Sequence, residues 1–433
     1  KNENASEYFL AGKSQNWFVV GSSLFAASVS SSTLMGHSGE GFISGIAVFN
    51  YNVGAIFVII FVSLFFLPFY IKSGIYTIPE YLGRRFDNRS RKYFSFITII
   101  GNVFLDAGAA LYTGALILKI IFPEIDMMWI IIGMALMAGT YTIIGGLSSA
   151  INADMIQSII LIAGSVLLSI FCFNSVGGWE NFVEHFHDGV WLNLIRPNSD
   201  TTVPWFSIFL SIPILGFYFW GNNQVIVQRV MSAKTVNEGR LGFLFVAFLY
   251  VFTLFIFIAP GMVGRMIDLF GVGDTLPNEI IDGNTLRAQY GIDTNEVYPR
   301  LILKLLPVGL IGVMIACMVS ALTSTLSATL SSVSTLFTMD FYKSWRPESS
   351  PRHLVRVGQW TSFIALVVAV LWAPLIGKFA SLVAYYQEFS SYLAPPIVGT
   401  FLVGLFWKGS TRNGAFAGLM SGLAMSALIM TYK

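Results

Sequence analysis

Residues 23–33 read SLFAASVSSST, and they place five serines and a threonine inside an apolar stretch long enough to cross a bilayer. Serine competes for backbone hydrogen bonds and lowers helix propensity, so Ala26 to Ser32 predict a membrane helix that unwinds near its middle. Small residues of this kind can instead serve only to let helices pack closely. Unwinding is favoured where such clusters recur at matching depth, because discontinuous helices expose backbone oxygen to an ion.

The composition predicts an all-α membrane protein. Of the 433 residues, 55% are hydrophobic and 11% are charged, and the mean hydropathy of +0.70 lies above the range of water-soluble domains. A bilayer-spanning helix needs about 20 apolar residues. The chain holds about eleven such stretches, at 17–36, 41–70, 94–121, 127–147, 150–175, 204–222, 241–264, 307–338, 357–376, 378–406 and 413–431.

Lysine and arginine gather in alternate connections between these stretches. Six of them lie between Lys72 and Lys92, and smaller groups lie at 229–240, 343–356 and 408–412, whereas the other connections are acidic. Basic connections stay in the cytoplasm, so the sequence predicts a multi-pass protein whose N-terminal end is cytoplasmic. The chain opens shortly before its first apolar stretch and stops directly after its last one. We therefore expect further helices beyond one or both ends of the chain.

Two later spans carry polar clusters of the same kind. The segment GFYFWGNNQ (216–224) predicts a second break, because glycine costs about 1 kcal/mol in a helix interior. In SALTSTLSATLSSVS (320–334), Ala321, Ser324 and Thr325 share one helix face. Broken spans one and six are five apart, which predicts an inverted five-plus-five repeat. The first copy covers 17–176, the second covers 204–406, and an additional C-terminal helix covers 413–431.

Three carboxylates lie within the predicted spans, where a charge costs about 3 kcal/mol and usually has a function. Asp106 is predicted either to lock helices together through a hydrogen bond or to contact a solute. Asp154 is either a charge favoured by the dipole of a helix N-terminus or part of an ion site. The third carboxylate within a predicted span is that of Glu388.

Patterns of enzymatic chemistry are not found in the sequence. The four histidines are scattered, and no metal-binding helix, nucleophile elbow or phosphate loop has its defined spacing. The glycines of GEGFISG (39–45) follow no predicted strand, so they do not indicate nucleotide binding. Basic residues between 84 and 92 can contact anionic membrane lipid, and topology accounts for them without a nucleic-acid partner. We therefore predict that the protein is not an enzyme.

Several longer strings carry a family resemblance. They are YFLAGKSQNWFVVGSSLFAASVSSST, FLPFYIKSGIYTIPEYLGRRF, YTIIGGLSSAINADMIQ, FWGNNQVIVQRVMSAK, STLFTMDFYK and APPIVGTFLVGLFWK. With them the chain resembles the sodium/solute symporter family, and within it the sodium/glucose and sodium/galactose cotransporters. The resemblance extends from the first residues to about 413. It implies the leucine-transporter-type form of the five-plus-five inverted repeat, a sodium ion as the coupling ion, and helices beyond the ends of this chain.

The resemblance also implies a sodium site between spans one and eight. Its ligands are the carbonyl oxygens of Ala26, Val29 and Ala321 and the hydroxyls of Ser324 and Thr325. A hard cation prefers several oxygen ligands, and unwound backbone supplies them without burying an anion. Some family members bind a second sodium, which Asp154 and Ser327 would hold here. Ala328 stands where that site has another hydroxyl.

The implied solute site differs from that of sugar cotransporters at both charged positions. Asn52 replaces a glutamate and Tyr250 replaces a lysine, so the resemblance predicts a neutral pocket. The implied solute-binding residues are Ser28, Thr33, Asn52, Gly216, Trp220, Asn223, Gln224, Tyr250 and Gln387; the implied gates are His37, Tyr51 and Phe219; Asp106 is expected to act structurally or in coupling.

These features predict a sodium-coupled secondary active symporter in the plasma membrane. It would move a small neutral polar solute, a sugar or polyol, into the cell by alternating access. One alternative is a sodium symporter for a non-sugar organic solute, and another is a channel or sensor that retains the fold. An anionic solute is disfavoured because the matched positions hold no lysine or arginine. The sequence leaves the oligomeric state open.

Overall fold

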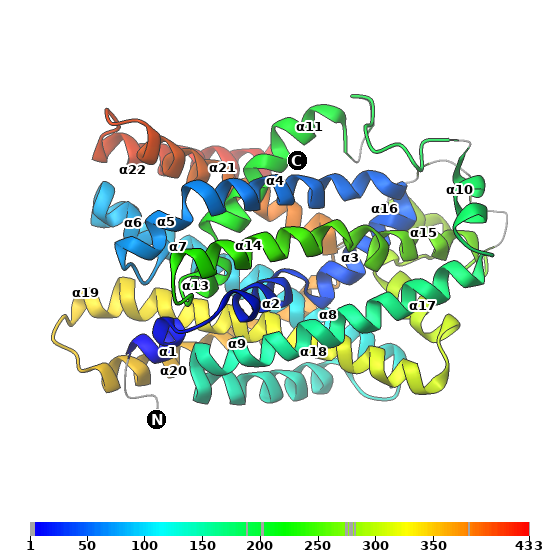
Figure 1. Cartoon of the computed structure of the whole chain (residues 1–433), viewed down its shortest axis with the longest axis horizontal. Coiled ribbons are helices and arrows are strands. Elements are labelled where there is room, and N and C mark those ends of the chain that lie inside the picture. Colours follow the sequence, from blue (N-terminus) through cyan, green and yellow to red (C-terminus); the bar gives the residue numbers. More distant parts are fainter. Residues whose placement is uncertain are drawn as a thin grey trace.

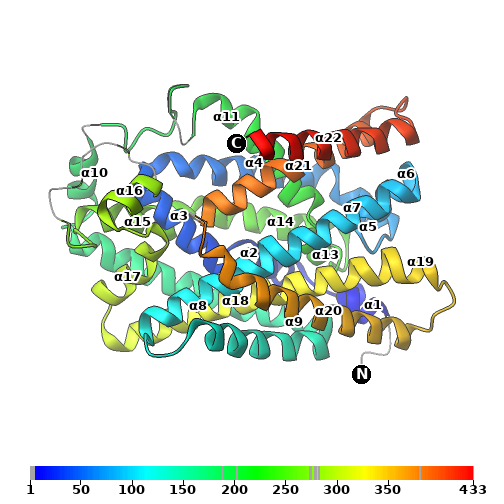
Figure 2. The same cartoon turned by 180° about the vertical axis from the view of Figure 1, so that it is seen from behind.

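The computed structural model describes residues 5–432 except 188, 201, 202, 273–275, 277–279, 281, 282, 380 and 381. The described part is a bundle of helices whose long axes run roughly along one direction (Figures 1 and 2). Within it, β-structure is limited to isolated bridges such as Gln15 with Ala233. The predicted all-α class is therefore confirmed.

The first half of the chain forms the helices up to the short α10. They are α1 Ala5–Leu10, α2 Trp17–Ser28, α3 Ser31–Ser44, α4 Phe49–Phe65, α5 Leu67–Ser73, α6 Ile78–Arg85, α7 Asn88–Gly101, the π-helical turn η3 Asn102–Ala107, α8 Gly108–Ile121, α9 Met127–Ser175 and α10 Trp179–His187.

The second half repeats the alternation of long helices and short irregular turns. Its helices are α11 Trp205–Phe209, α12 Ser211–Phe217, the π-helical turn η4 Tyr218–Asn222, α13 Gln224–Val230, α14 Val236–Val251, the π-helical turn η5 Leu254–Ile258, α15 Ala259–Met266, α16 Gly283–Tyr290, α17 Val297–Leu305, α18 Val308–Leu336, the π-helical turn η8 Phe337–Tyr342, α19 Lys343–Trp345, α20 Pro351–Ile376, α21 Leu382–Phe406 and α22 Arg412–Tyr432.

In the described residues, seven helices are long and apolar enough to cross a membrane, or eight if the pair 236–251 and 254–266, bent by 42°, is one span. This is fewer than the eleven predicted stretches, and one reason is that the stretch 413–431, which forms α22, is not among the qualifying helices. Helix α9 contains two of those stretches and turns at Gly146, whose φ of 64° only glycine adopts readily. The first predicted span is divided into α2 and α3, and α2 alone is too short to cross.

Both predicted helix breaks are present. Helix α2 ends at Ser28, Val29 is non-helical, and Ser30 is extended and caps α3 by accepting the amide of Thr33 at 3.2 Å. In the second half, Asn223 is extended and its side chain accepts the amide of Val225 at 2.8 Å. Each break thus has a polar side chain that satisfies a backbone group freed at the start of the following helix.

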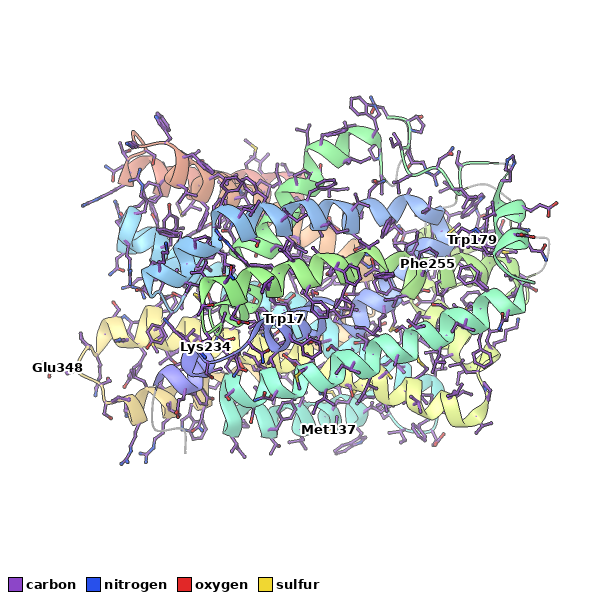
Figure 3. The ribbon with its side chains drawn as sticks, in the orientation of Figure 1. Trp17, Met137, Trp179, Lys234, Phe255 and Glu348 are labelled. Atoms are coloured by element: carbon purple, nitrogen blue, oxygen red, sulfur yellow. The ribbon has the colours of Figure 1, made fainter. Side chains whose placement is uncertain are left out.

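The ends of the bundle differ in the connections that they carry. Helices α6, α13 and α19 lie at one end, whereas α10, α16 and α17 lie at the other (Figures 1 and 2). Figure 3 places Lys234 and Glu348 toward the first end and Trp179 toward the second. The basic connections of the sequence therefore gather at a single end, as the charge pattern predicts.

The interior is built around α18. It packs along α9, while α14 packs against α2 and α4. Large apolar side chains cover the outside instead, for example Trp129, which is 70% exposed, and Phe209, which is 71% exposed. An apolar outer surface is what a membrane protein presents to lipid, so the packing agrees with the composition.

Candidate functional site

A cavity of about 230 Å³ lies between the two helix breaks. Its walls come from the break between α2 and α3 and from α4, η3, η4, α14, α18 and α21. Most residues that the sequence assigns to the solute site or its gates line it. These are Ser28, Thr33, His37, Tyr51, Asn52, Gly216, Phe219, Trp220, Asn223 and Tyr250.

The hydroxyl side chains at the first break bond mainly to one another and to nearby backbone. Ser28 Oγ donates to the carbonyl of Phe25 at 3.0 Å, and Thr33 Oγ1 donates to the carbonyl of Ser28 at 3.3 Å. Ser30 Oγ lies 2.6 Å from Ser32 Oγ. The bond from Thr33 gives a partner to the carbonyl of Ser28 at the end of α2, which helps to explain why the break is tolerated in a membrane.

The residues implied for sodium lie on two helices in contact, α2 and α18. Thr325 lines the cavity, and its Oγ1 donates to the carbonyl of Ala321 at 3.1 Å. Ser324 is fully buried, and Ala26 and Val29 stand at the buried end of α2. The available donors are carbonyl and hydroxyl oxygens, a set that fits sodium. In the described residues no group of three His, Cys, Asp or Glu side chains could hold another kind of metal.

Asp154 connects this region to the second broken helix. Its Oδ1 accepts from Ser324 Oγ at 2.5 Å, and its Oδ2 accepts from Ser23 Oγ at 2.8 Å and from Arg229 Nη2 at 2.8 Å. The carboxylate lies eight residues past the turn at Gly146, beyond the first helical turn on which a dipole acts. Of the two expectations for Asp154, the helix-terminus role is therefore not supported.

Arg229 is the residue of this site that the sequence analysis missed. The charge pattern of the sequence places it among the basic residues of a predicted cytoplasmic connection. In the structure its side chain is only 1% exposed and forms an ion pair with Asp154. Its Nη1 also donates to the carbonyl of Val225. Ser327, predicted to join Asp154 at a second sodium site, is buried on α18 but is not among the described hydrogen-bond partners of that carboxylate.

Gln224 is placed outside the cavity, contrary to its predicted contact with solute. Its Oε1 accepts the amide of Ile78 at 2.9 Å, and its Nε2 donates to the carbonyl of Tyr76 at 3.1 Å. The amide thus binds the start of α6 rather than the cavity. The side chain of Gln387 lies outside the described part of the chain, and its predicted role stays a prediction.

Asp106 lines the cavity, so a carboxyl group stands there beside the neutral polar side chains that the sequence predicts. It stands on the π-helical turn η3, a type of irregularity frequent at functional sites. The phenol of Tyr386 on α21 lies beside its carboxyl group. The turn itself is held by Asn102 Nδ2, which donates to Ser332 Oγ of α18 at 2.7 Å.

Aromatic side chains form much of the remaining wall. The rings of Trp220 and Tyr250 meet edge to face with centroids 5.3 Å apart, and those of Phe219 and Trp220 do so at 5.3 Å. His37 Nδ1 lies 3.1 Å from the carbonyl of Thr33. Apolar ring faces with a few polar groups between them are typical of a site for a small molecule.

The sodium:solute symporter family matches residues 8–422. The chain belongs to this family. It is 33% identical to "Solute carrier family 5 member 4" of Rattus norvegicus, over 98% of this chain and 66% of that protein. It is also 34% identical to "Sodium/mannose cotransporter SLC5A10" of Bos taurus, over 97% and 73% of the two chains, and 33% identical to "Sodium/glucose cotransporter" of Vibrio parahaemolyticus, over 99% and 80%.

Solved structures show the same fold. A "Na+-coupled sialic acid symporter" in a substrate-bound outward-open state superposes with a TM-score of 0.82 at 22% identity, over 99% of this chain and 93% of that one. A closed conformation of the nucleobase-cation-symport transporter Mhp1 has a TM-score of 0.59 over 100% and 95%. The predicted leucine-transporter-type fold and the class of membrane symporter, rather than enzyme, are therefore confirmed for this family member. The chain spans about two thirds to four fifths of the curated relatives above.

Proposed function

We propose that the chain couples sodium to the uptake of a small polyhydroxyl solute of the sugar or polyol class. The observation that carries the proposal is the cavity between the two helix breaks, which Thr325 lines and which Ser324 adjoins on α18. The names of the relatives support the same class of solute, since they include sodium/mannose, sodium/glucose and sodium/myo-inositol cotransporters.

Sodium at Ala26, Val29, Ala321, Ser324 and Thr325 would hold the end of α2 against α18. That contact fixes one wall of the cavity, because Ser28 and Thr325 both line it. Sodium and solute then stabilise the same conformation without touching, so each raises the affinity for the other by the same factor. The two five-helix repeats, 17–176 and 204–406, would each contribute a broken helix to the cavity, and rocking of the helix bundle against the scaffold would open it to each side in turn.

The direction of transport follows from charge. The basic end of the bundle, with α6, α13 and α19, would face the cytoplasm of a cell bounded by the plasma membrane (Figure 1). Helix α1, Ala5–Leu10, lies toward that end as well. Sodium would enter from the opposite end, where α10, α16 and α17 lie, and carry the solute inward.

We further propose a single coupled sodium ion. A second ion would need the carboxylate of Asp154, but three donors already contact its oxygens, and one of them is the guanidinium of Arg229 at 2.8 Å. The arginine supplies the positive charge that a sodium ion would otherwise bring, and a second cation would be repelled by it.

Uptake by proteoliposomes tests the proposal. Purified protein is reconstituted, and accumulation of labelled glucose, mannose and myo-inositol is measured with an inward sodium gradient and with potassium in its place. We expect accumulation above the outside concentration with sodium only, and a sodium activation curve with a Hill coefficient near one. Downhill flux that does not depend on sodium would instead indicate a channel, and a Hill coefficient near two would overturn the single-ion assignment.

A further inference from the structure

The carboxyl group of Asp106 is the part of the cavity that the proposed function does not use. Aspartate, histidine and tyrosine are the titratable residues among those that line the cavity, namely His37, Tyr51, Asp106, Tyr218, Tyr250 and Tyr386. No lysine or arginine of the described chain lines it. The carboxylate therefore meets hydrogen-bond donors there but no permanent positive charge.

A carboxyl group in such a setting either holds a proton or is paired with a positive charge. Burying an ionised group without a partner is costly, and one phenol from Tyr386 replaces only part of its hydration. None of the described ion pairs includes Asp106, in contrast to Asp154 and Asp340, which pair with Arg229 and Arg91. The missing positive charge can come from whatever occupies the cavity.

The aromatic wall suits a positive charge as well as a sugar ring. Tyr51, Tyr218, Phe219, Trp220, Tyr250 and Tyr386 line the cavity together with Asp106. Ring faces attract an ammonium group, and the attraction is stronger where water is excluded. Hydroxyl and amide groups remain for a polyol, from Ser28, Thr33, Asn52 and Asn223.

We propose that the solute is a polyol or sugar that carries a protonated amine, and that Asp106 receives the ammonium group. This inference rests on the proposed function. It specifies the polyhydroxyl solute of that proposal as one that carries a single positive charge. The ammonium donates hydrogen bonds to the carboxylate while the hydroxyl groups bind the neutral polar side chains. Asp106 then acts as the residue that selects the amine.

Matched pairs of solutes test the inference in proteoliposomes with sodium. The pairs are glucose with glucosamine, galactose with galactosamine, and sorbitol with 1-amino-1-deoxysorbitol. At pH 7 we expect the amine to bind about tenfold tighter or more in at least one pair, the size of a charge-assisted hydrogen bond. We expect the same pair to lose its preference in Asp106→Asn. The matched control Glu388→Gln changes a membrane carboxylate that does not line the cavity, and it should keep the preference.

Two readouts need no variant and therefore do not depend on how Asp106→Asn folds. Transport of the amine should carry one more positive charge per solute than transport of its neutral partner. For the glucosamine and galactosamine pairs, raising the pH from 7 to 9 should remove the preference, because an amine beside the acetal carbon of the ring loses its proton at about pH 8. The alkylamine of 1-amino-1-deoxysorbitol stays protonated over this range, so that pair should keep its preference. The neutral partner, measured at each pH, corrects for any effect of pH on the protein itself.

The outcomes separate the inference from the proposed function. Equal binding of both members in every pair, or an unchanged preference in Asp106→Asn, overturns the amine assignment while sodium-driven uptake of neutral sugars would still stand. Binding of no member of the panel also overturns it. Flux indifferent to sodium removes the proposed function instead.

Discussion

Arg229 Nη2 lies 2.8 Å from Asp154 Oδ2, and the two side chains are 1% and 0% exposed. The pair joins α9 to α13, and the hydroxyls of Ser23 and Ser324 complete the shell of the carboxylate. A buried ion pair gains little over an apolar pair of similar shape, but removal of one partner leaves an uncompensated charge. We therefore expect the protein to tolerate replacement of both charged residues better than replacement of one.

We expect Asp154→Asn to destabilise the protein by about 3–5 kcal/mol, because the guanidinium of Arg229 stays buried without its carboxylate. The double variant Asp154→Leu with Arg229→Met removes both charges and should recover most of that loss. Thermal unfolding in detergent measures both. A double variant that melts no higher than Asp154→Asn would contradict this account of the pair.

Sodium binding is tested at α18. Ser324→Ala with Thr325→Ala removes the two hydroxyl ligands, and we expect sodium-dependent uptake to be lost or its half-saturating sodium concentration to rise at least tenfold. The control Ser362→Ala removes a buried hydroxyl that donates to the carbonyl of Leu330, away from the cavity lining. Unchanged sodium activation in the double variant would place the ion elsewhere.

The breaks were predictable because their cause is local. Serine-rich and glycine-rich segments disfavour a helix by their own chemistry, and the chain does unwind at Val29 and at Asn223. The burial of Arg229 was not predictable, because the positive-inside rule counts charges along the chain and cannot see which ones fold inward. Gln224 is a predicted solute ligand through the family resemblance alone, and a resemblance does not show that tertiary contacts with α6 occupy its amide.

The placement of Asp106 shows another limit of sequence patterns. Helical spacing assigns faces on a period of 3.6 residues, but the π-helical turn η3 shifts that period where Asp106 stands. The sequence predicts only that this membrane carboxylate either bonds to another helix or contacts a solute, and the structure places it beside the phenol of Tyr386 and in the cavity wall.

Two glycines allow α3 to approach its neighbours closely. A Cβ atom at Gly41 would overlap the carbonyl oxygen of Ile258, and one at Gly261 would overlap that of Ser38. Gly41→Ala should therefore lower the free energy of unfolding by about 1–3 kcal/mol, the usual cost of overpacking. The control Gly309→Ala has open space around its Cβ and should have little effect on the melting temperature. Equal melting of the two variants would mean that α3 moves aside without cost.

Gln228 closes the end of the bundle that we propose to be cytoplasmic. Its Nε2 donates to the carbonyl of Phe9 at 2.7 Å and to Thr335 Oγ1 of α18 at 2.8 Å. Each bond contributes about 1 kcal/mol, or a factor of about five in an equilibrium. Gln228→Met should therefore raise the population that is open at this end.

Thiol labelling measures that population. A cysteine introduced at the cavity residue Ser28 is labelled with a membrane-impermeant reagent in inside-out vesicles, where the two native cysteines are buried. We expect labelling about fivefold faster or more with Gln228→Met, because α13 and α18 separate more readily. The control Gln157→Met removes a longer bond, 3.3 Å to Thr323 Oγ1, and should change the rate little. Equal rates in both variants would mean that the bonds of Gln228 do not hold this end closed.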